Sequence, residues 1–463
     1  MRKLITISIV AALAGCAMAP SYERPESPVA DKWASGGTGG ESVDAVGWRD
    51  FYKDAKLQNV ITLALENNGD LRVSALNVEK LRAQYRIQRA NILPEISASG
   101  AETRTLTPGD LSASGSPTTS DQYSLKVGVT SWDLDLFGRV RSLNKAALET
   151  YLAGESSRDG VRIALIAEVV DQYLTRISLA DTLRIARENL DAVTKSRDLT
   201  LEMRKNGKSS ELDVASAEAS VFSAQADVSA CERRLALADN ALALVVGCAV
   251  PAELLEDAAS LENIVLDTNV SAGLPSDLLT RRPDIVSAEH TLKAANADIG
   301  AARAAFFPKI ALTGSYGTAS AELSGLFNNG SEAWTFAPTI SVPIFSGGAN
   351  RASLDATKIE KRIDIVSYEN AIRTAFREVS DVLVSSEPLR REMELNVAQT
   401  AAQKKRLDLA TERYRAGLDS YLVVISAQQA YFSAQRAEVS SRLSLLENRV
   451  TFYKALGGGW QAE

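Results

Sequence analysis

Side chains that commonly carry catalysis are scarce in this chain of 463 residues, which holds one histidine, three cysteines and four methionines. The single histidine, His290, sits in SAEHTL on a predicted helix. No P-loop, HExxH, CxxC or GxGxxG motif occurs anywhere in the chain. A packed or solvated histidine explains His290 better than a catalytic one, although a hydrolase that uses it is one alternative. We therefore predict that the protein is not an enzyme.

The thiol with the clearest chemistry is that of Cys16, which ends the tetrapeptide LAGC. A charged start and an apolar run over 4–13 precede it, so residues 1–15 are predicted to be a lipoprotein signal peptide. Cys16 is then the predicted lipidation site. Ala17, which follows it, resembles the residue found there in lipoproteins sent to the outer membrane. The sequence predicts a covalent lipid on Cys16 and no other cofactor.

The remaining cysteines, Cys231 and Cys248, lie on or near one predicted helix. Along a straight helix they would be roughly 25 Å apart, which excludes a disulfide unless the helix ends between them. We expect both to be small buried hydrophobes. So few thiols, thioethers and imidazoles argue weakly against a copper or silver pathway, and no metal site is predicted.

Charge and hydropathy exclude further classes of protein. The net charge is −7 and the pI is about 5.2, so no basic stripe is available to neutralise nucleic-acid phosphates. After the predicted signal peptide no run of 18 apolar residues remains, and no transmembrane helix is predicted.

The two halves of the chain repeat one another. GKSSELDVASAEASVFSAQ from Gly207 matches GLDSYLVVISAQQAYFSAQ from Gly417, and the stretch from Asp70 matches that from Asp284. A period above 200 residues is too long for a solenoid, so we infer two copies of one domain-sized unit. The predicted segments are the signal peptide 1–15, an acylated linker and equatorial segment 16–54, a first repeat 55–248, an equatorial connection 249–275, a second repeat 276–457 and a tail 458–463.

Each repeat contains one very long helical pattern, 139–206 in the first and 349–416 in the second. At 1.5 Å per residue each helix would run about 100 Å, a length typical of coiled-coil assemblies rather than of globular cores. Gly207 and Gly417 then break the pattern, and a second helix returns antiparallel. The repeat is therefore predicted to be a helical hairpin with the glycine at its tip.

Two strands precede each long helix, after a helix that is predicted to end at Pro94 or Pro308. Apolar and polar residues alternate over 123–130 and over 334–344. Four strands cannot close a membrane barrel, whose smallest examples have about eight, whereas three chains would pool about 12. The partner strands are predicted to begin at Glu95 and Lys309, and the aromatic side chains that would suit a membrane interface are Tyr123, Trp132, Tyr316, Trp334 and Phe336.

Five motifs are distinctive: DLDLFGR (Asp133–Arg139), GLPSDLLTRRPDI (Gly273–Ile285), ANADIGAARAAFFPKI (Ala295–Ile310), RYRAGLDSYL (Arg413–Leu422) and YKALGGGW (Tyr453–Trp460). Through them nearly the whole mature chain resembles the TolC-like outer membrane efflux channels, in particular the acylated OprM-like (NodT-type) branch. The resemblance implies an α+β membrane protein: a TolC-like homotrimer with a 12-stranded outer-membrane β-barrel, four strands per chain, on a 12-helix periplasmic α-barrel.

The same resemblance implies a function: a passive exit duct of a tripartite RND-type multidrug efflux pump in the outer membrane. Its partners would be outer-membrane lipid, a periplasmic adaptor (membrane fusion) protein and an inner-membrane RND transporter, and no nucleic acid. Exported drugs, dyes or detergents would be the cargo. Two alternatives from other classes are a type I secretion duct and a periplasmic coiled-coil scaffold lipoprotein without a pore.

The family places the glycine tips at the periplasmic end, where they close the aperture and meet the adaptor. Asp213 and Tyr414 match positions that hydrogen-bond between neighbouring helix pairs in TolC-like channels. Asp213 is equally expected to cap the returning helix, since Ser209 and Ser210 precede it. The resemblance implies gate residues Leu212, Asp213, Tyr414, Leu422, Val423 and Ser426, and adaptor-contacting residues Arg204, Gly207, Gly417, Leu418 and Asp419.

One departure from the family concerns charge at the aperture. Related channels often carry an acidic ring on the second returning helix, where this chain has Val423 and Ser426. Gln429 also replaces a residue that can be basic in relatives. We therefore expect the aperture to be closed by packing of Leu422, Val423 and Ile425 more than by charge.

Overall fold

The computed structural model describes residues 18–33, 41–43, 46–255, 260–267 and 270–459. The predicted signal peptide and Cys16 lie outside these residues. The chain divides into two compact units. The first unit contains the described residues up to Glu26 with Asn77–Glu155 and Ser287–Tyr368, and the second contains those in Ser27–Leu76, Ser156–Val286 and Glu369–Glu463.

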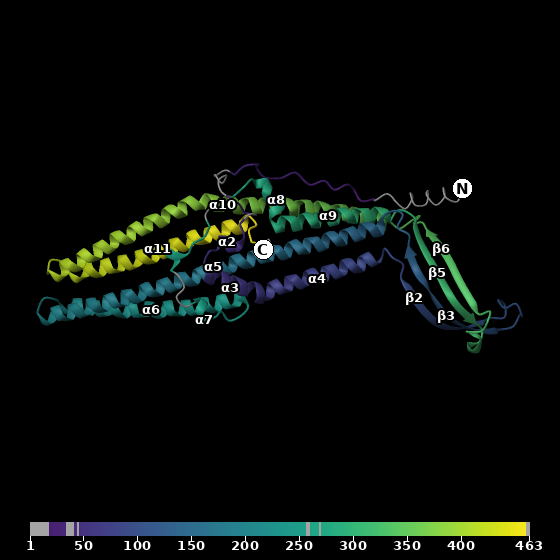
Figure 1. Cartoon of the computed structure of the whole chain (residues 1–463), viewed down its shortest axis with the longest axis horizontal. Helices are drawn as coiled ribbons and strands as arrows, with labels where there is room; N and C mark the ends of the chain where they lie inside the picture. Colours follow the sequence, from purple (N-terminus) through teal and green to yellow (C-terminus); the bar gives the residue numbers. More distant parts are fainter. Residues whose placement is uncertain (1–17, 34–40, 44–45, 256–259, 268–269, 460–463) are drawn as a thin grey trace. The chain divides into compact units, whose positions relative to one another are not determined.

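The first unit holds a four-stranded antiparallel sheet in the order β2-β3-β5-β6 (Figure 1). The central pair β3–β5 joins the two sequence repeats, with Val127 opposite Tyr316. The prediction of two strands per repeat is confirmed. The strands are β2 (Ile96–Thr107), β3 (Thr118–Asp133), β5 (Lys309–Ser320) and β6 (Glu332–Ser341).

The last strand is shorter than the alternation predicted. The apolar pattern was expected to continue to Ile344, but β6 ends at Ser341. Pro343 follows closely and has no amide hydrogen to donate to a neighbouring strand. The aromatic residues expected at a membrane interface differ in exposure. Tyr316, Trp334 and Phe336 are exposed, whereas Tyr123 and Trp132 are half-buried.

The helices that enter the sheet end earlier than predicted. α4 (Gly69–Ala90) and α9 (Pro283–Ala304) each stop four residues before the proline that was expected to end them. A short turn fills each gap, with Leu93 N donating to Ala90 O and Phe307 N to Ala304 O. The proline therefore begins the approach to the strand rather than ending the helix.

The long helices are as predicted. α5 (Arg139–Lys205) and α10 (Ala349–Arg415) have 67 residues each, and α6 (Glu211–Val246) and α11 (Tyr421–Ala455) follow them (Figure 1). α6 returns antiparallel along α5, because Val193 packs with Val221 and Ala186 with Cys231. None of the described helices combines the length and hydropathy needed to cross a membrane.

Short elements and a buried aromatic core fill the rest of the second unit. Phe51 stacks on Tyr453 with 4.2 Å between ring centroids, and the Tyr453 hydroxyl donates to Val46 O at 2.8 Å. This contact fixes the end of α11 against the segment after Val46. The short elements are α2 (Trp48–Phe51), α3 (Ala55–Asn67), α7 (Ala252–Leu255), α8 (Leu278–Arg281), the 3-10 turns at Leu261–Asn263 and Pro275–Asp277, and a parallel pair β1 (Glu41–Ser42) and β4 (Val270–Ser271).

The motif TRRPDI has a structural explanation in the same unit. The guanidinium of Arg282, which is buried, pairs with Asp284 at 2.7 Å and with Glu378 at 2.6 Å. It also donates to the carbonyl of Ala455 at 3.0 Å. A buried arginine needs this number of acceptors, and its contacts connect the beginning of α9 with α10 and the end of α11.

The cysteines differ in part from expectation. α6 does end between them, at Val246, with Gly247 in the left-handed region as its C-cap. Both thiols are nevertheless free. Cys231 is buried as predicted, whereas Cys248 is only half-buried because it lies just beyond the helix end.

In the first unit the segment that follows Cys16 is held along α9. Arg24 forms a bidentate contact with Glu289 at 2.8 and 3.1 Å, and Tyr22 donates to the same carboxylate at 3.1 Å. Lys293 is a second cation on Glu289, at 3.2 Å. Burial alone would raise the pKa of Glu289, but the hydrogen bonds and charges of Arg24 and Lys293 outweigh it and lower the pKa. We call these residues, Tyr22, Arg24, Glu289 and Lys293, the N-terminal clamp.

Candidate functional site

Each helical hairpin turns at a glycine with positive φ. Gly207 has φ 70° and Gly417 has φ 74°, and a Cβ at either position would meet no atom within 4 Å. The requirement for glycine is therefore conformational rather than steric. The turns close in the same way, with Lys208 N donating to Met203 O at 2.8 Å and Leu418 N to Arg413 O at 3.0 Å.

Asp213 completes a capping box with Ser210, the N-cap residue of the returning helix at the first tip. Its backbone N–H donates to Ser210 Oγ at 3.1 Å, while its carboxylate accepts from Ser210 N at 2.9 Å. Ser209 Oγ donates to the same carboxylate at 3.1 Å. The hydrogen bond from the Ser210 backbone, with those from the two hydroxyls, lowers the pKa of Asp213 against a smaller opposing effect of burial. The expected capping contact is present.

The second tip is held by a different pair of side chains. Arg413 forms a bidentate ion pair with Asp419, at 2.7 and 3.0 Å, and this hydrogen-bonded contact lowers the pKa of Asp419. At the first tip Arg204 pairs with Glu211. Four of the five residues expected to contact an adaptor therefore have structural roles within one chain: Arg204 and Asp419 in ion pairs, and Gly207 and Gly417 in the turns.

Tyr414 lies where the two hairpins meet. Its side chain is buried and its hydroxyl donates to Thr200 Oγ1 of α5 at 3.3 Å. The hydroxyl also lies 3.5 Å from Ser209 Oγ, the same hydroxyl that donates to Asp213. In one chain the expected pairing of Tyr414 with Asp213 is thus relayed through Ser209 rather than direct.

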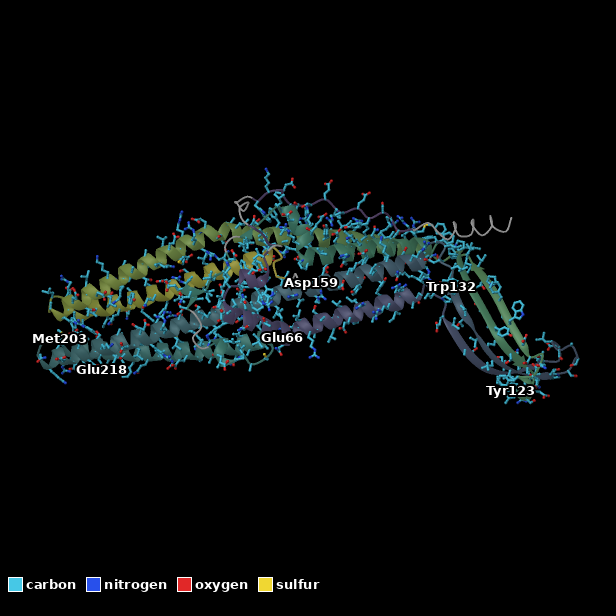
Figure 2. The ribbon with its side chains drawn as sticks, in the orientation of Figure 1. Glu66, Tyr123, Trp132, Asp159, Met203 and Glu218 are labelled. Atoms are coloured by element: carbon cyan, nitrogen blue, oxygen red, sulfur yellow. The ribbon has the colours of Figure 1, made fainter. Side chains whose placement is uncertain are left out.

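A small apolar cluster surrounds that tyrosine. We call it the tip cluster: the buried residues Met203, Ala217, Tyr414, Tyr421 and Val424, with Leu199 and Ile425 packed against them. The rings of Tyr414 and Tyr421 are 5.3 Å apart. Figure 2 labels Met203 at this tip. The cluster draws on α5, α6, α10 and α11, so it joins both hairpins of one chain.

The apolar gate residues Leu212, Leu422 and Val423 lie outside this cluster, as does Leu418, which was expected to contact the adaptor. Leu212, Leu418 and Leu422 are 75%, 67% and 71% exposed, and Val423 is 39% exposed. Ser426 contacts Arg406, whose guanidinium lies 3.4 Å from its hydroxyl. Of the three residues expected to close the aperture by packing, Ile425 packs against the tip cluster, whereas Leu422 and Val423 are not part of it. A tip with this much apolar surface favours contact with another chain.

Sequence reasoning missed Thr200 and Tyr421 as parts of this site, and it placed Ser209 beside Asp213 without its link to Tyr414. Thr200 is fully buried, although threonine in the middle of a long amphipathic helix gives no signal of burial. Tyr421 could have been predicted, because an aromatic residue that begins the returning helix lies near the end of the preceding helix. The Arg406 contact to Ser426 was likewise unforeseen.

Two other groups singled out in the sequence have structural partners. His290 Nδ1 lies 2.7 Å from Glu149 Oε2, a contact between α9 and α5 inside the first unit. Asp133 in DLDLFGR pairs with Arg139 at 2.7 Å and with Lys309 at 3.2 Å, so the motif shapes the passage from β3 to α5. Among the described residues no group of three or more His, Cys, Asp or Glu side chains could hold a metal ion.

Each of the two repeats contributes two antiparallel strands and one glycine-tipped helical hairpin. This arrangement defines the TolC-like class of outer membrane channel. The chain matches the outer membrane efflux protein family over residues 60–248 and 274–458, and it belongs to that family. It is an outer-membrane protein that extends into the periplasm, as this family does.

Individual relatives agree over almost the full length. The probable efflux pump outer membrane protein TtgC of Pseudomonas putida is 43% identical, covering 99% of this chain and 96% of that protein. The outer membrane protein OprJ of Pseudomonas aeruginosa is 42% identical, with 98% and 95% covered. The open state of the MtrE outer membrane channel of Neisseria gonorrhoeae superposes with a TM-score of 0.87 at 39% identity, covering 96% and 99%.

Proposed function

We propose that this protein is the passive exit duct of a tripartite RND-type multidrug efflux pump, gated at its periplasmic tips. The tip cluster carries the proposal. It holds both hairpins of a chain together through Tyr414, yet leaves Leu212, Leu418 and Leu422 exposed. A contact of this kind is strong enough to fix a resting state and weak enough for a partner to open, since a single hydrogen bond contributes about 1 kcal/mol.

A homotrimer is the assembly we propose. The strands β2 and β6 are the edges of the four-stranded sheet, and unpaired edges favour pairing with another copy. Three copies related by a threefold axis would close a 12-stranded barrel on 12 helices. The exposed side chains of Tyr316, Trp334 and Phe336 would then face lipid at its interfaces.

The partners follow from the names of the relatives, which are components of efflux pumps. A passive duct needs an energy source elsewhere, so we propose a periplasmic adaptor protein and an inner-membrane RND transporter. Exposed Leu418 and the turn at Gly207 would contact the adaptor. A type I secretion duct is the second candidate.

Complementation of drug export tests this function. In a host that lacks its own outer-membrane channels, the protein expressed with a compatible adaptor and RND transporter should lower the accumulation of a fluorescent dye. A matched strain that carries the adaptor and transporter alone is the control. Restored secretion of a type I protein substrate without restored dye export would instead identify a secretion duct.

Acylation of Cys16 is a separate proposal. A duct inserted through its strands should stay in the outer membrane when Cys16→Ala removes the lipid, because the lipid is only a supplementary anchor. A periplasmic scaffold held by its lipid alone would be released. Fractionation of membranes after a high-salt wash separates the two, with wild-type protein as the reference.

A further inference from the structure

A groove in the second unit is lined by more arginine side chains than carboxylates. It lies between α5 and the connection from α3 to α4, and its volume is about 680 Å³. Three arginines line it, Arg72, Arg158 and Arg162, against two carboxylates, Glu66 and Asp159. Figure 2 labels Glu66 and Asp159, which come from α3 and α5. We call it the arginine groove.

The charges in the arginine groove are unequally paired. Arg158 holds Asp159 through contacts of 2.7 and 3.1 Å, so these two neutralise each other. Within the described part of the chain, Arg72, Arg162 and Glu66 form no ion pair within 4.0 Å and no side-chain hydrogen bond. Apart from the mutually neutralised Arg158–Asp159 pair, the charged groups of the lining are therefore two guanidinium groups and one exposed carboxylate, that of Glu66.

Arg162 is the more informative of the two. Its Nε is buried and has no hydrogen-bond partner among the described residues. A buried charged donor without an acceptor is costly, and an oxyanion bound to the other nitrogens of the same guanidinium offsets part of that cost. The planar fork of a guanidinium suits a carboxylate, sulfonate or phosphate, each of which can accept two parallel hydrogen bonds.

The rest of the lining is mostly apolar, and its one polar residue, Asn68, already has hydrogen-bond partners in Val245 O and Leu71 N. Leu65, Leu71 and Ala75 line it beside the arginines. A volume of this size is within the range of pockets that hold small molecules, and such pockets combine apolar walls with a few polar groups that fix orientation. The lining therefore fits a molecule with an apolar body and one anionic end.

We propose that the arginine groove binds small organic anions. Their oxyanion pairs with Arg162 and Arg72, and their apolar part packs on Leu65, Leu71 and Ala75. The site is independent of the gate, since it shares no residue with the tip cluster. It also adds a ligand class, organic acids, that the exit-duct function by itself does not specify.

Fluorine NMR of the full-length protein in phosphatidylcholine nanodiscs tests the site. The probe is 4-(trifluoromethyl)benzoate, and its neutral isostere 4-(trifluoromethyl)benzamide controls for binding through the apolar body alone. The variants are Arg162→Gln, Arg72→Gln and Glu66→Gln. Arg86→Gln, an exposed arginine of α4 outside the groove, is the matched control.

We expect saturable binding of the benzoate that weakens by about tenfold or more in Arg162→Gln and Arg72→Gln, because each variant loses a charge-assisted hydrogen bond to the oxyanion. Glu66→Gln should tighten binding, since it removes the competing anion, and Arg86→Gln should change nothing. Arg72 is exposed, so its variant stays informative if Arg162→Gln fails to fold. Equal affinities for benzoate and benzamide, equal losses in Arg86→Gln, or no saturable binding to the wild type would each overturn the proposal.

Discussion

The hydroxyl of Tyr414 on α10 donates to Oγ1 of Thr200 on α5 across 3.3 Å, and both side chains are buried. This bond links the second hairpin of the chain to the first at their tips. It connects two elements that are more than 200 positions apart in the sequence and come from different repeats. The duplication therefore supplies two similar hairpins whose tips make unlike contacts.

Removing the Tyr414 hydroxyl should loosen the tip without dissolving the tip cluster. Tyr414→Phe keeps the ring against Tyr421 and should lower the opening free energy of nearby amides by about 1 kcal/mol. Tyr414→Ala should cost about 3–5 kcal/mol, because it leaves a cavity. Hydrogen exchange read by mass spectrometry measures both. Thr200→Val is the partner variant, and a double variant that is simply additive with Tyr414→Phe would show that the two groups do not interact.

Loss of the cap at Asp213 should fray the start of α6. Asp213→Ala is expected to cost about 1 kcal/mol, seen as faster exchange over the first turn of α6. Glu218→Ala, an exposed site on the same helix, should leave that exchange unchanged. Because the folded-state pKa of Asp213 is lowered, its contribution is present above its ordinary range near 4 and is lost as the pH falls below it. Equal exchange in the two variants would remove the capping role.

The tip glycines should tolerate no side chain. Gly207→Ala and Gly417→Ala force an L-residue to positive φ, at about 1–2 kcal/mol each. Gly69→Ala is the control, because Gly69 lies in the first turn of α4 at a negative φ and an added Cβ would meet no atom within 4 Å. Limited proteolysis at the tips should quicken in the first two variants and not in the third. Comparable cleavage in all three would contradict the conformational argument.

Asp171 of α5 should make the stability of the fold depend on pH with a sign opposite to that of Asp213. Burial, followed by the charges of Glu447 and Glu168, raises its pKa to about 7 against the opposing charge of Lys454. Because the folded-state pKa of Asp171 is raised, its contribution to stability is fully present below the ordinary pKa of aspartate, near 4. This contribution is lost as the pH rises through 7.

Asp171→Asn imitates the protonated form. The variant should match the wild type near pH 4 and exceed its stability at pH 8 by on the order of 2 kcal/mol. Thermal unfolding followed by tryptophan fluorescence at both pH values measures the difference, with Asp198→Asn on the same helix as the exposed control. A difference that is the same at both pH values would show that Asp171 does not titrate in this range.

The N-terminal clamp predicts protection of the segment after Cys16. Glu289→Ala removes the acceptor of both Arg24 and Tyr22, so this segment should be cut faster after Glu23 and Glu26 by a glutamate-specific protease. Glu79→Ala, exposed on α4, is the control. An unchanged cleavage rate in Glu289→Ala would mean that contacts elsewhere hold the segment.

The long helices, their tip glycines and the four strands could be predicted from sequence, because their signals are local. Apolar spacing, alternation and positive-φ glycines each depend on neighbours within a few positions. The capping box of Ser210 and Asp213 was also foreseeable, since capping is a contact within one turn.

The partners of Tyr414 could not be predicted in this way. Thr200 is a neighbour only because two hairpins from different repeats pack together, and no period in either repeat encodes that register. The arginine groove has the same origin, because its lining comes from α3, α4 and α5 and depends on their packing rather than on a local pattern. Membership of the family added the position of the gate but not these contacts.

Single-channel conductance in planar bilayers tests the central claim, a pore that its tips hold shut. Purified wild-type protein is compared with Tyr414→Phe and Asp213→Ala. The account predicts a small conductance for the wild type and a larger one for each variant, because each removes a contact at the tips. Equal small conductances in all three would contradict the gate, and a correctly assembled protein without conductance would contradict the pore.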